Sequence, residues 1–265
     1  YSDKSGLLPA TRVYDIYEDH AGNEWVLTNN GLGMLAAGNR TMASYFVETA
    51  KQEKGKGQFF YVAQEYGNEI FFGSDHGRIW RYQKQGGQFE LLQLPASSRI
   101  VEIKKINEQA ILIVTKTDGF FVYDVASKGM EHYEASRLPK APVRSAYMDK
   151  YSEIWFEQEV PGTVAHFNAK TKVLKTEVIP VEPTSTDRSR PAFHVHEDIY
   201  GTVWVHPYGG GFSRFDRENN RLQSFYNGLS DANWRFSNKI HSAFSDRQGN
   251  LWMCTHSKGL EKITF

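Results

Sequence analysis

Short runs in which aromatic or β-branched residues alternate with polar residues recur along the whole chain, separated by turn-forming residues. Between Phe193 and Tyr226 these runs cover 193–197, 202–206, 212–216 and 221–226. Alternation with a period of two predicts β-strands, and the Gly, Asn and Asp residues between runs predict turns. No run shows a convincing amphipathic helical pattern. The pattern therefore predicts an all-β protein built from units of four antiparallel strands.

One motif recurs six times along the chain, and its first and last copies are the clearest. The first copy contains Asp19, Gly22, Asn23, Trp25 and Gly31, and the last contains Asp246, Gly249, Asn250, Trp252 and Gly259. The anchor positions are 25, 71, 113, 155, 204 and 252, so successive copies lie 46, 42, 42, 49 and 48 residues apart. A regular spacing in this range predicts a repeat architecture. Four-stranded units repeated radially predict a β-propeller with about six blades.

We therefore expect a single β-propeller domain over residues 1–265. Its repeats are expected near residues 13–35, 60–82, 101–124, 144–168, 193–216 and 240–263. The chain begins at Tyr1 and its last copy runs only as far as a third strand, which suggests a piece of a longer protein. Either six blades close imperfectly, or the chain is part of a longer propeller array.

The spacing that recurs from copy to copy has a structural explanation. The large anchor side chain on the second strand is expected to fill the wedge between neighbouring blades. The Asp-x-x-Gly-Asn segment is expected to form a tight hairpin turn. The glycines that follow, at positions 31, 77, 119, 162, 210 and 259, are expected to allow backbone angles that other residues resist.

Composition narrows the classes of function. The chain has 31 basic and 31 acidic residues and no formal net charge, which argues against a nucleic-acid or anionic-membrane surface. No stretch is long enough and apolar enough for a transmembrane helix. The single cysteine, Cys254, is expected to act as a small buried apolar residue. Residues 181–191 are expected to form an exposed polar loop.

With its anchors in place, the motif Asp-x-x-Gly-Asn-x-Trp…Thr…Gly-Leu resembles the two-component regulator propeller repeat. The resemblance is best at residues 13–35, 193–216 and 240–263 and covers essentially the whole chain. It implies the extracytoplasmic, periplasmic sensor region of hybrid histidine kinase/response regulators of Bacteroidetes. In that family, further propellers, an immunoglobulin-like domain, a membrane span and kinase domains belong to the same polypeptide, and the ligands are often glycan-derived oligosaccharides.

The candidate binding site lies on loops, because propellers usually place function there. The loops between second and third strands share one end of each blade with the loops that join blades. Polar and aromatic residues of these loops form the predicted ligand site: Asn30, Asp75, His76, Glu157, Arg188, Arg190, His206, Tyr208, Asn233, Trp234, Arg235 and His256. Such groups suit sugar hydroxyls, and the arginines suit a carboxylate or sulfate. Trp234 and Arg235 are the most suggestive pair, although Trp234 could equally plug the space between two blades.

Three alternatives remain open at this stage. His194, His196 and His206 could approach one another, but a metal site needs three or four convergent ligands, and no metal or cofactor is predicted. A propeller lyase similar to streptogramin B lyase would use His206 or His256, with Glu157 nearby and magnesium. A protein-interaction platform, including a homodimer, would use the loop end as an interface. Because no catalytic motif is present, the favoured prediction is a non-catalytic oligosaccharide sensor.

Overall fold

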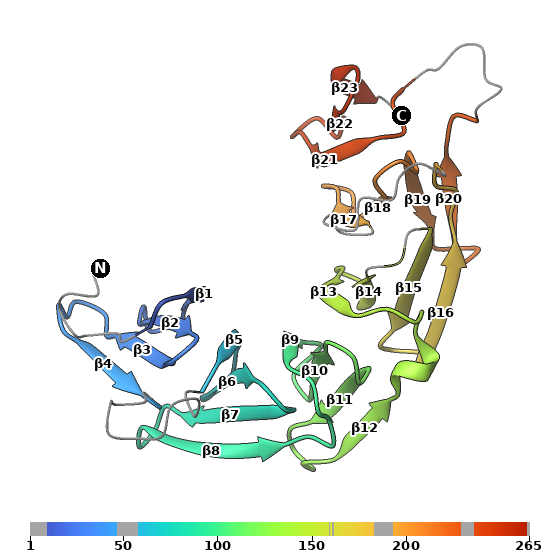
Figure 1. Cartoon of the computed structure of the whole chain (residues 1–265). Helices are drawn as coiled ribbons and strands as arrows, with labels where there is room; N and C mark the ends of the chain where they lie inside the picture. Colours follow the sequence, from blue (N-terminus) through green and yellow to red (C-terminus); the bar gives the residue numbers. More distant parts are fainter. Residues whose placement is uncertain are drawn as a thin grey trace. The chain divides into compact units, whose positions relative to one another are not determined.

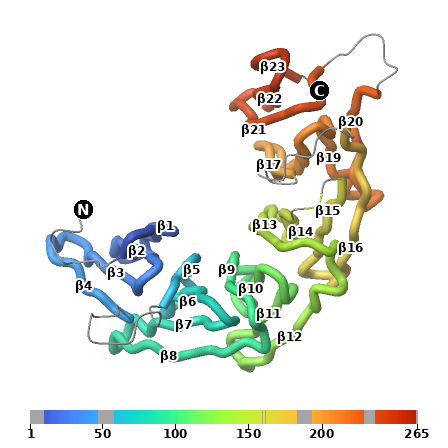
Figure 2. Tube along the Cα trace, viewed as in Figure 1, coloured from blue at the N-terminus to red at the C-terminus, as the bar shows by residue number. Residues whose placement is uncertain are grey.

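The computed structural model describes residues 10–46, 58–158, 160, 162–182, 193–228 and 236–263. The contacts divide the chain into two compact units, residues 1–133 and 134–265. In the described residues each unit holds three antiparallel sheets, and within a unit the sheets follow one another in chain order (Figures 1 and 2). The all-β prediction is confirmed, and each predicted repeat falls within one sheet. The single-domain assignment stays a prediction.

Every sheet of the first unit is a four-stranded meander. Its strands are β1 (Val13–Glu18), β2 (Glu24–Thr28), β3 (Gly31–Leu35) and β4 (Met42–Tyr45); β5 (Phe60–Tyr66), β6 (Glu69–Ser74), β7 (Arg78–Gln83) and β8 (Gln88–Gln93); and β9 (Ile100–Lys105), β10 (Ala110–Thr115), β11 (Phe120–Asp124) and β12 (Met130–Tyr133).

The second unit repeats this plan after a short 3₁₀ helix, η2 (Ala135–Arg137). Its strands are β13 (Val143–Met148), β14 (Glu153–Gln158), β15 (Thr163–Asn168) and β16 (Val173–Val178); β17 (His194–Glu197), β18 (Val203–His206), β19 (Phe212–Asp216) and β20 (Arg221–Phe225); and β21 (Ile240–Ser245), β22 (Leu251–Thr255) and β23 (Gly259–Ile263). Strands β17–β20 agree with the four predicted runs to within one residue at each end.

The motif's anchor residues form the core between successive sheets. Trp25 on β2 packs against Phe60, Ala63 and Phe72 of the second sheet, and Trp155 on β14 packs against Val203 of the fifth. The anchors Trp25, Phe71, Ile113, Trp155 and Trp204 are all at most 3% exposed. The predicted role of these residues as wedges between sheets is therefore confirmed where a following sheet packs on them.

The sixth sheet departs from this rule, and so does its cysteine. Trp252 is half-buried and Cys254 is exposed, so the prediction of a buried cysteine is wrong. Both residues lie on one face of β22, because side chains two positions apart on a strand share a face. Within the part of the second unit that the structure describes, no further sheet covers that face.

The glycine prediction needs one correction. Gly31, with a φ of 92°, shows the expected conformation, and it donates its N–H to the Gln58 carbonyl of the next repeat. In the fifth copy the equivalent residue is Gly211, with a φ of 64°, rather than Gly210. Gly211 donates in the same way to Asn238, so the extra residues of this loop shift the special backbone position by one.

The meander gives every sheet two distinct ends. Turns that join first to second and third to fourth strands lie at one end, which we call the turn face. Loops that join second to third strands and one sheet to the next lie at the other end, which we call the loop face. Residues 183–191 of the predicted polar loop lie outside the described residues. Nowhere in the described ranges is there a helix suited to crossing a membrane.

Candidate functional site

The aspartate of the repeat clasps the first turn of the first, fourth, fifth and sixth sheets. In the first sheet, Asp19 Oδ1 accepts hydrogen bonds from the backbone N–H groups of Ala21 and Asn23, at 3.0 and 2.9 Å. Its Oδ2 accepts the indole N–H of Trp25, at 3.1 Å. Burial opposes ionisation of this carboxyl group, but the hydrogen bonds from Asn23 and Trp25 outweigh it and lower the pKa of Asp19. One side chain thus shapes the turn and satisfies the buried anchor.

The fifth and sixth sheets use the same arrangement. Asp198 accepts the indole N–H of Trp204 at 3.0 Å, and Asp246 accepts that of Trp252 at 2.9 Å. The hydrogen bond from Trp252 is the largest cause that holds the pKa of Asp246 at about 2. The sequence spacing Asp-x-x-Gly-Asn-x-Trp therefore records a hydrogen-bond geometry.

In the fourth sheet, the equivalent carboxylate, that of Asp149, has a different partner. Asp149 Oδ1 still clasps the turn, accepting the N–H groups of Tyr151 and Glu153 at 2.9 and 3.0 Å. Its Oδ2 accepts Nη2 of Arg217 at 2.7 Å instead of an indole. The Nε1 atom of Trp155 is buried and has no hydrogen-bond partner in the described residues. An unpaired buried donor costs about 1–3 kcal/mol, so this arrangement costs stability.

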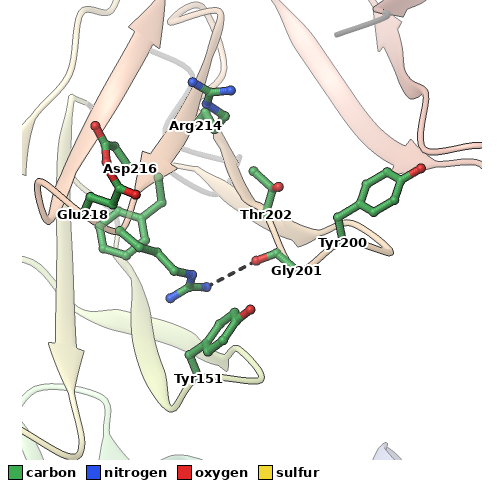
Figure 3. Close-up of a pocket in the computed structure, with 9 residues that line it drawn as sticks. Tyr151, Tyr200, Gly201, Thr202, Arg214, Asp216 and Glu218 are labelled. Carbon is green, nitrogen blue, oxygen red and sulfur yellow. Dashed lines mark hydrogen bonds between the residues drawn. The ribbon is translucent and has the colours of Figure 1, made fainter.

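Arg217 is held from several sides. It directly follows β19, and its guanidinium lies 4.1 Å from the ring centre of Tyr151 and 5.4 Å from that of Phe215. Its Nη2 also lies 3.4 Å from the carbonyl oxygen of Gly201, the contact drawn in Figure 3. An ion pair with the fully buried Asp149 carboxylate and an aromatic stack fix this side chain before any ligand arrives.

Two hollows flank Arg217 on the turn face of the fourth and fifth sheets, and we call them together the turn-face groove. Figure 3 shows one, of about 490 Å³. It is lined by Tyr151, Tyr200, Gly201, Thr202, Arg214, Phe215, Asp216, Arg217 and Glu218. The second, of about 520 Å³, shares Tyr151, Phe215 and Arg217 with the first. Its other lining residues are Glu153, Asn168, Lys170, Thr171, Val173 and Asn220.

A buried charged cluster supports the floor of the groove. His166 Nδ1 lies 2.5 Å from Glu153 Oε1, and its ring stacks on Trp155 at 4.7 Å. Burial opposes the imidazolium form, but hydrogen bonds with Glu153 and Glu177 outweigh it and raise the pKa of His166. Burial likewise opposes ionisation of Glu177, yet His166 and its other donors lower that pKa to about 2. The cluster is therefore an ion network beneath the fourth sheet's anchor.

On the loop face of the first unit, the predicted residues Asn30, Asp75 and His76 occupy second-to-third turns. The Asn30 backbone N–H donates to Thr28, and His76 is exposed with a φ of 56°. Asp75 accepts the hydroxyl of Tyr61 at 3.0 Å. Burial, followed by the charge of Asp75, raises the pKa of that tyrosine.

Tyr61 is the centre of a small aromatic group that sequence reasoning missed. Its ring lies 4.7 Å from that of Tyr14, and the guanidinium of Arg99 lies 4.9 Å from its centre. Tyr14 and Tyr61 each sit at a β-bulge in the first strand of a sheet. A bulge redirects a side chain, and no short sequence signal announces it.

On the loop face of the second unit, the structure brings predicted residues together in two groups. His194 links the first group: its Nδ1 lies 4.0 Å from Glu157, and its ring lies 5.3 Å from that of His206. His241, which sequence reasoning missed, links the second group, with ring centres 5.5 Å from Tyr208 and 5.7 Å from His256.

His206 is the most perturbed member of these groups. It is 3% exposed, and burial, reinforced by His194 and His196, lowers its pKa to about 3. It is therefore neutral at ordinary pH. No three His, Cys, Asp or Glu side chains of the described residues form a group able to hold a metal ion.

Five predicted site residues lie outside the described residues: Arg188, Arg190, Asn233, Trp234 and Arg235. The turn-face groove was not predicted, because the candidate ligand site was expected on loops and not on the hairpin turns. A signal did exist: Tyr151 and Tyr200 occupy the third position of an Asp-x-x turn, where a tight turn has no need of a large ring.

Comparison with known families finds a match at two stretches of the chain. The family described as two component regulator propeller matches residues 7–30 and 235–257. These matches overlap the predicted first and last copies. No curated protein matches the chain.

Solved structures share the fold at low sequence identity. The extracellular domain of a putative hybrid two component system from B. thetaiotaomicron is 17% identical with a TM-score of 0.58, over 97% of this chain and 34% of that one. A second such domain from the same organism is 15% identical with a TM-score of 0.55, over 97% of this chain and 38% of that one. This chain thus spans about a third of the length of these relatives.

A catalytically inactive virginiamycin B lyase from Staphylococcus aureus, solved with quinupristin, is 13% identical with a TM-score of 0.60. That match covers 94% of this chain and 83% of the lyase. Likeness at these identities establishes the fold and leaves the activity open. The chain has a β-propeller-type fold, and its residues 7–30 and 235–257 match the two component regulator propeller family.

Proposed function

We propose that this chain is a non-catalytic ligand-sensing region of a hybrid two-component system and that it binds a glycan-derived oligosaccharide. The observation that carries the proposal is the pairing of two-component regulator propeller repeats with a fold that matches extracellular domains of such systems over 97% of the chain. The same relatives support a periplasmic location and a kinase elsewhere in the polypeptide. Binding would shift the packing of the propeller or its neighbours, and that shift would bias the kinase.

The loop face supplies suitable chemistry for a sugar. In the second unit, the ring of Tyr208 offers an apolar face and Glu157 offers an acceptor for hydroxyl groups. In the first unit, Tyr61 and Asp75 offer the same chemistry separately. Asp75 and Tyr208 lie on loops, the usual position of binding residues, and Tyr61 and Glu157 lie near the strand ends beside such loops. Trp234 and Arg235 remain proposed members of this site.

The test is a thermal-shift screen of the chain against a panel of oligosaccharides, with and without magnesium. A ligand that binds only the folded chain must raise the melting temperature with dose. A hit whose effect is reduced in Tyr208→Ala or Trp234→Ala, but kept in Phe244→Ala, which removes an exposed ring outside the site, would support sensing at the loop face. An unchanged melting temperature with every oligosaccharide would contradict the oligosaccharide proposal and favour an interaction platform. Size-exclusion chromatography would then detect a dimer.

A lyase is the second candidate, because the match to virginiamycin B lyase covers most of that enzyme. The burial of His206 argues against a lyase that uses this histidine as its base. A histidine with a pKa of about 3 is a weak base, whereas efficient general acid–base catalysis needs a pKa near the working pH. Incubation with a streptogramin B antibiotic and magnesium, followed by mass spectrometry, decides the matter: linearised product would establish the lyase.

A further inference from the structure

We propose that the turn-face groove of the fourth and fifth sheets is a second binding site, which holds a neutral oligosaccharide against Tyr151 and Tyr200. The proposal rests on the ligand class of the proposed function but places a site at the opposite end of the sheets. All of its residues belong to the second unit.

The first argument is the identity of the turn residues. The third position of the Asp-x-x turn is Ala21 in the first sheet and Gln248 in the sixth, so the turn itself requires no ring. In the fourth and fifth sheets it is Tyr151, which is 45% exposed, and Tyr200, which is 66% exposed. Figure 3 labels both residues among those that line one hollow. Exposed rings with a hydroxyl group suit the apolar faces and hydroxyls of sugars.

The second argument is preorganisation at a cost. In three sheets the repeat's aspartate satisfies the anchor indole, but Asp149 is diverted to fix Arg217 and leaves Trp155 unpaired. A buried unsatisfied donor in a repeat that elsewhere satisfies it calls for an explanation. Holding Arg217 flat against Tyr151 positions both side chains in advance, and preorganised groups lose less entropy when a ligand binds.

The third argument is charge and size. The cations Arg214, Arg217 and Lys170 are matched by the anions Asp216, Glu218 and Glu153, and Arg217 already has the Asp149 carboxylate as its partner. A groove without excess positive charge favours a neutral ligand over an anion.

The groove's dimensions point to a chain of sugars. Each hollow is within the usual range of ligand pockets, about 300–1,000 Å³. The two hollows, of about 490 and 520 Å³, meet at Tyr151 and Arg217. A linear oligosaccharide that crosses this stacked pair would occupy both, whereas a single sugar would fill only one.

The experiment is titration calorimetry of the full chain with maltohexaose, cellohexaose and mannohexaose, and with hexagalacturonate as the charged comparison. Loss of one ring contact should weaken binding of the best neutral hexasaccharide about tenfold in Tyr151→Ala and in Tyr200→Ala. Tyr151→Phe, which keeps the ring, should retain binding to within about threefold. The matched control Phe244→Ala removes a ring that is 49% exposed and lies outside the groove, and it should bind like the wild type. Tyr208→Ala is measured beside it as the loop-face variant. Melting curves of all variants confirm folding.

Each other outcome is informative. Loss in Tyr208→Ala with no change in Tyr151→Ala and Tyr200→Ala would overturn the turn-face site and leave the proposed sensing function intact. Preference for hexagalacturonate would overturn the neutral assignment. Failure of every hexasaccharide to bind would count against both this site and the proposed ligand class.

Discussion

The first and fourth sheets carry the same turn but use its aspartate differently. Asp19 satisfies both its turn and the buried indole of Trp25, whereas Asp149 keeps the turn and gives its second oxygen to Arg217. The indole N–H of Trp155 is buried without a hydrogen-bond partner in the described residues, and its ring stacks on His166, whose pKa is raised. The difference teaches that a repeat motif is a set of hydrogen bonds. Redirecting one acceptor exchanges local stability for a fixed cation at the surface.

Replacement of Asp19 and of Asp149 is expected to give the largest changes in the free energy of unfolding. Asp19→Ala removes acceptors from two backbone N–H groups and from a buried indole, so we expect a loss of about 3 kcal/mol in the free energy of unfolding. Asp149→Ala orphans the same two backbone groups but no indole, and the partly exposed Arg217 can turn to water, so about 2 kcal/mol is expected. Guanidinium unfolding of both variants measures the difference. An equal or larger loss for Asp149→Ala would contradict the account.

Replacement of the two tryptophans by phenylalanine isolates the indole hydrogen bond. Both changes remove similar buried volume. Trp25→Phe also removes the indole donor to Asp19 Oδ2, which keeps only the side-chain amide of Asn23, whereas Trp155→Phe removes a donor that had no hydrogen-bond partner in the described residues. We expect Trp25→Phe to cost about 1–2 kcal/mol more than Trp155→Phe. Hydrogen exchange, read on peptides covering β2 and β14, reports each sheet separately. Equal loss of protection would show that the indole contact with Asp19 contributes nothing.

Mild acid should destabilise the fifth sheet more than the fourth, because each sheet contains a buried histidine with an oppositely shifted pKa. The pKa of His206 is lowered to about 3, so the unfolded chain binds this proton more readily, and the contribution of neutral His206 is lost as pH falls below about 6.5. The loss is at most about 1.4 kcal/mol per pH unit. His166 has a raised pKa, so its contribution is complete below about 6.5 and is lost only as pH rises through its folded pKa.

Hydrogen exchange between pH 6.5 and 5, corrected for the intrinsic rate, should therefore show β18 losing protection and β15 keeping it. His206→Asn serves as the control, because it should flatten the response of β18. A matching response of both strands would contradict the assigned ionisation states.

Much of the fold was predictable because it depends on local patterns. Strands β17–β20 follow from alternation, and the clasped turns follow from the Asp-to-Trp spacing. Cys254 was misjudged because its burial depends on a neighbouring sheet rather than on its own residues. Gly210 was misjudged because one loop is longer.

Candidate site residues were harder to predict than strands. The groups around His241 and Tyr61 depend on bulges and on contacts between sheets, which spacing does not record. The partner of Asp149 is Arg217, 68 residues away in the chain, and no motif connects the two. Sequence spacing therefore indicates what each sheet does for itself and much less of what two sheets build together.

The measurement that tests the central claim most directly is calorimetric titration of the chain with the best oligosaccharide of the screen, followed by mass analysis of the recovered ligand. The account predicts saturable binding and recovery of the ligand unchanged, with or without magnesium. Conversion of the ligand, or no saturable binding by any oligosaccharide tested, would contradict a non-catalytic oligosaccharide sensor.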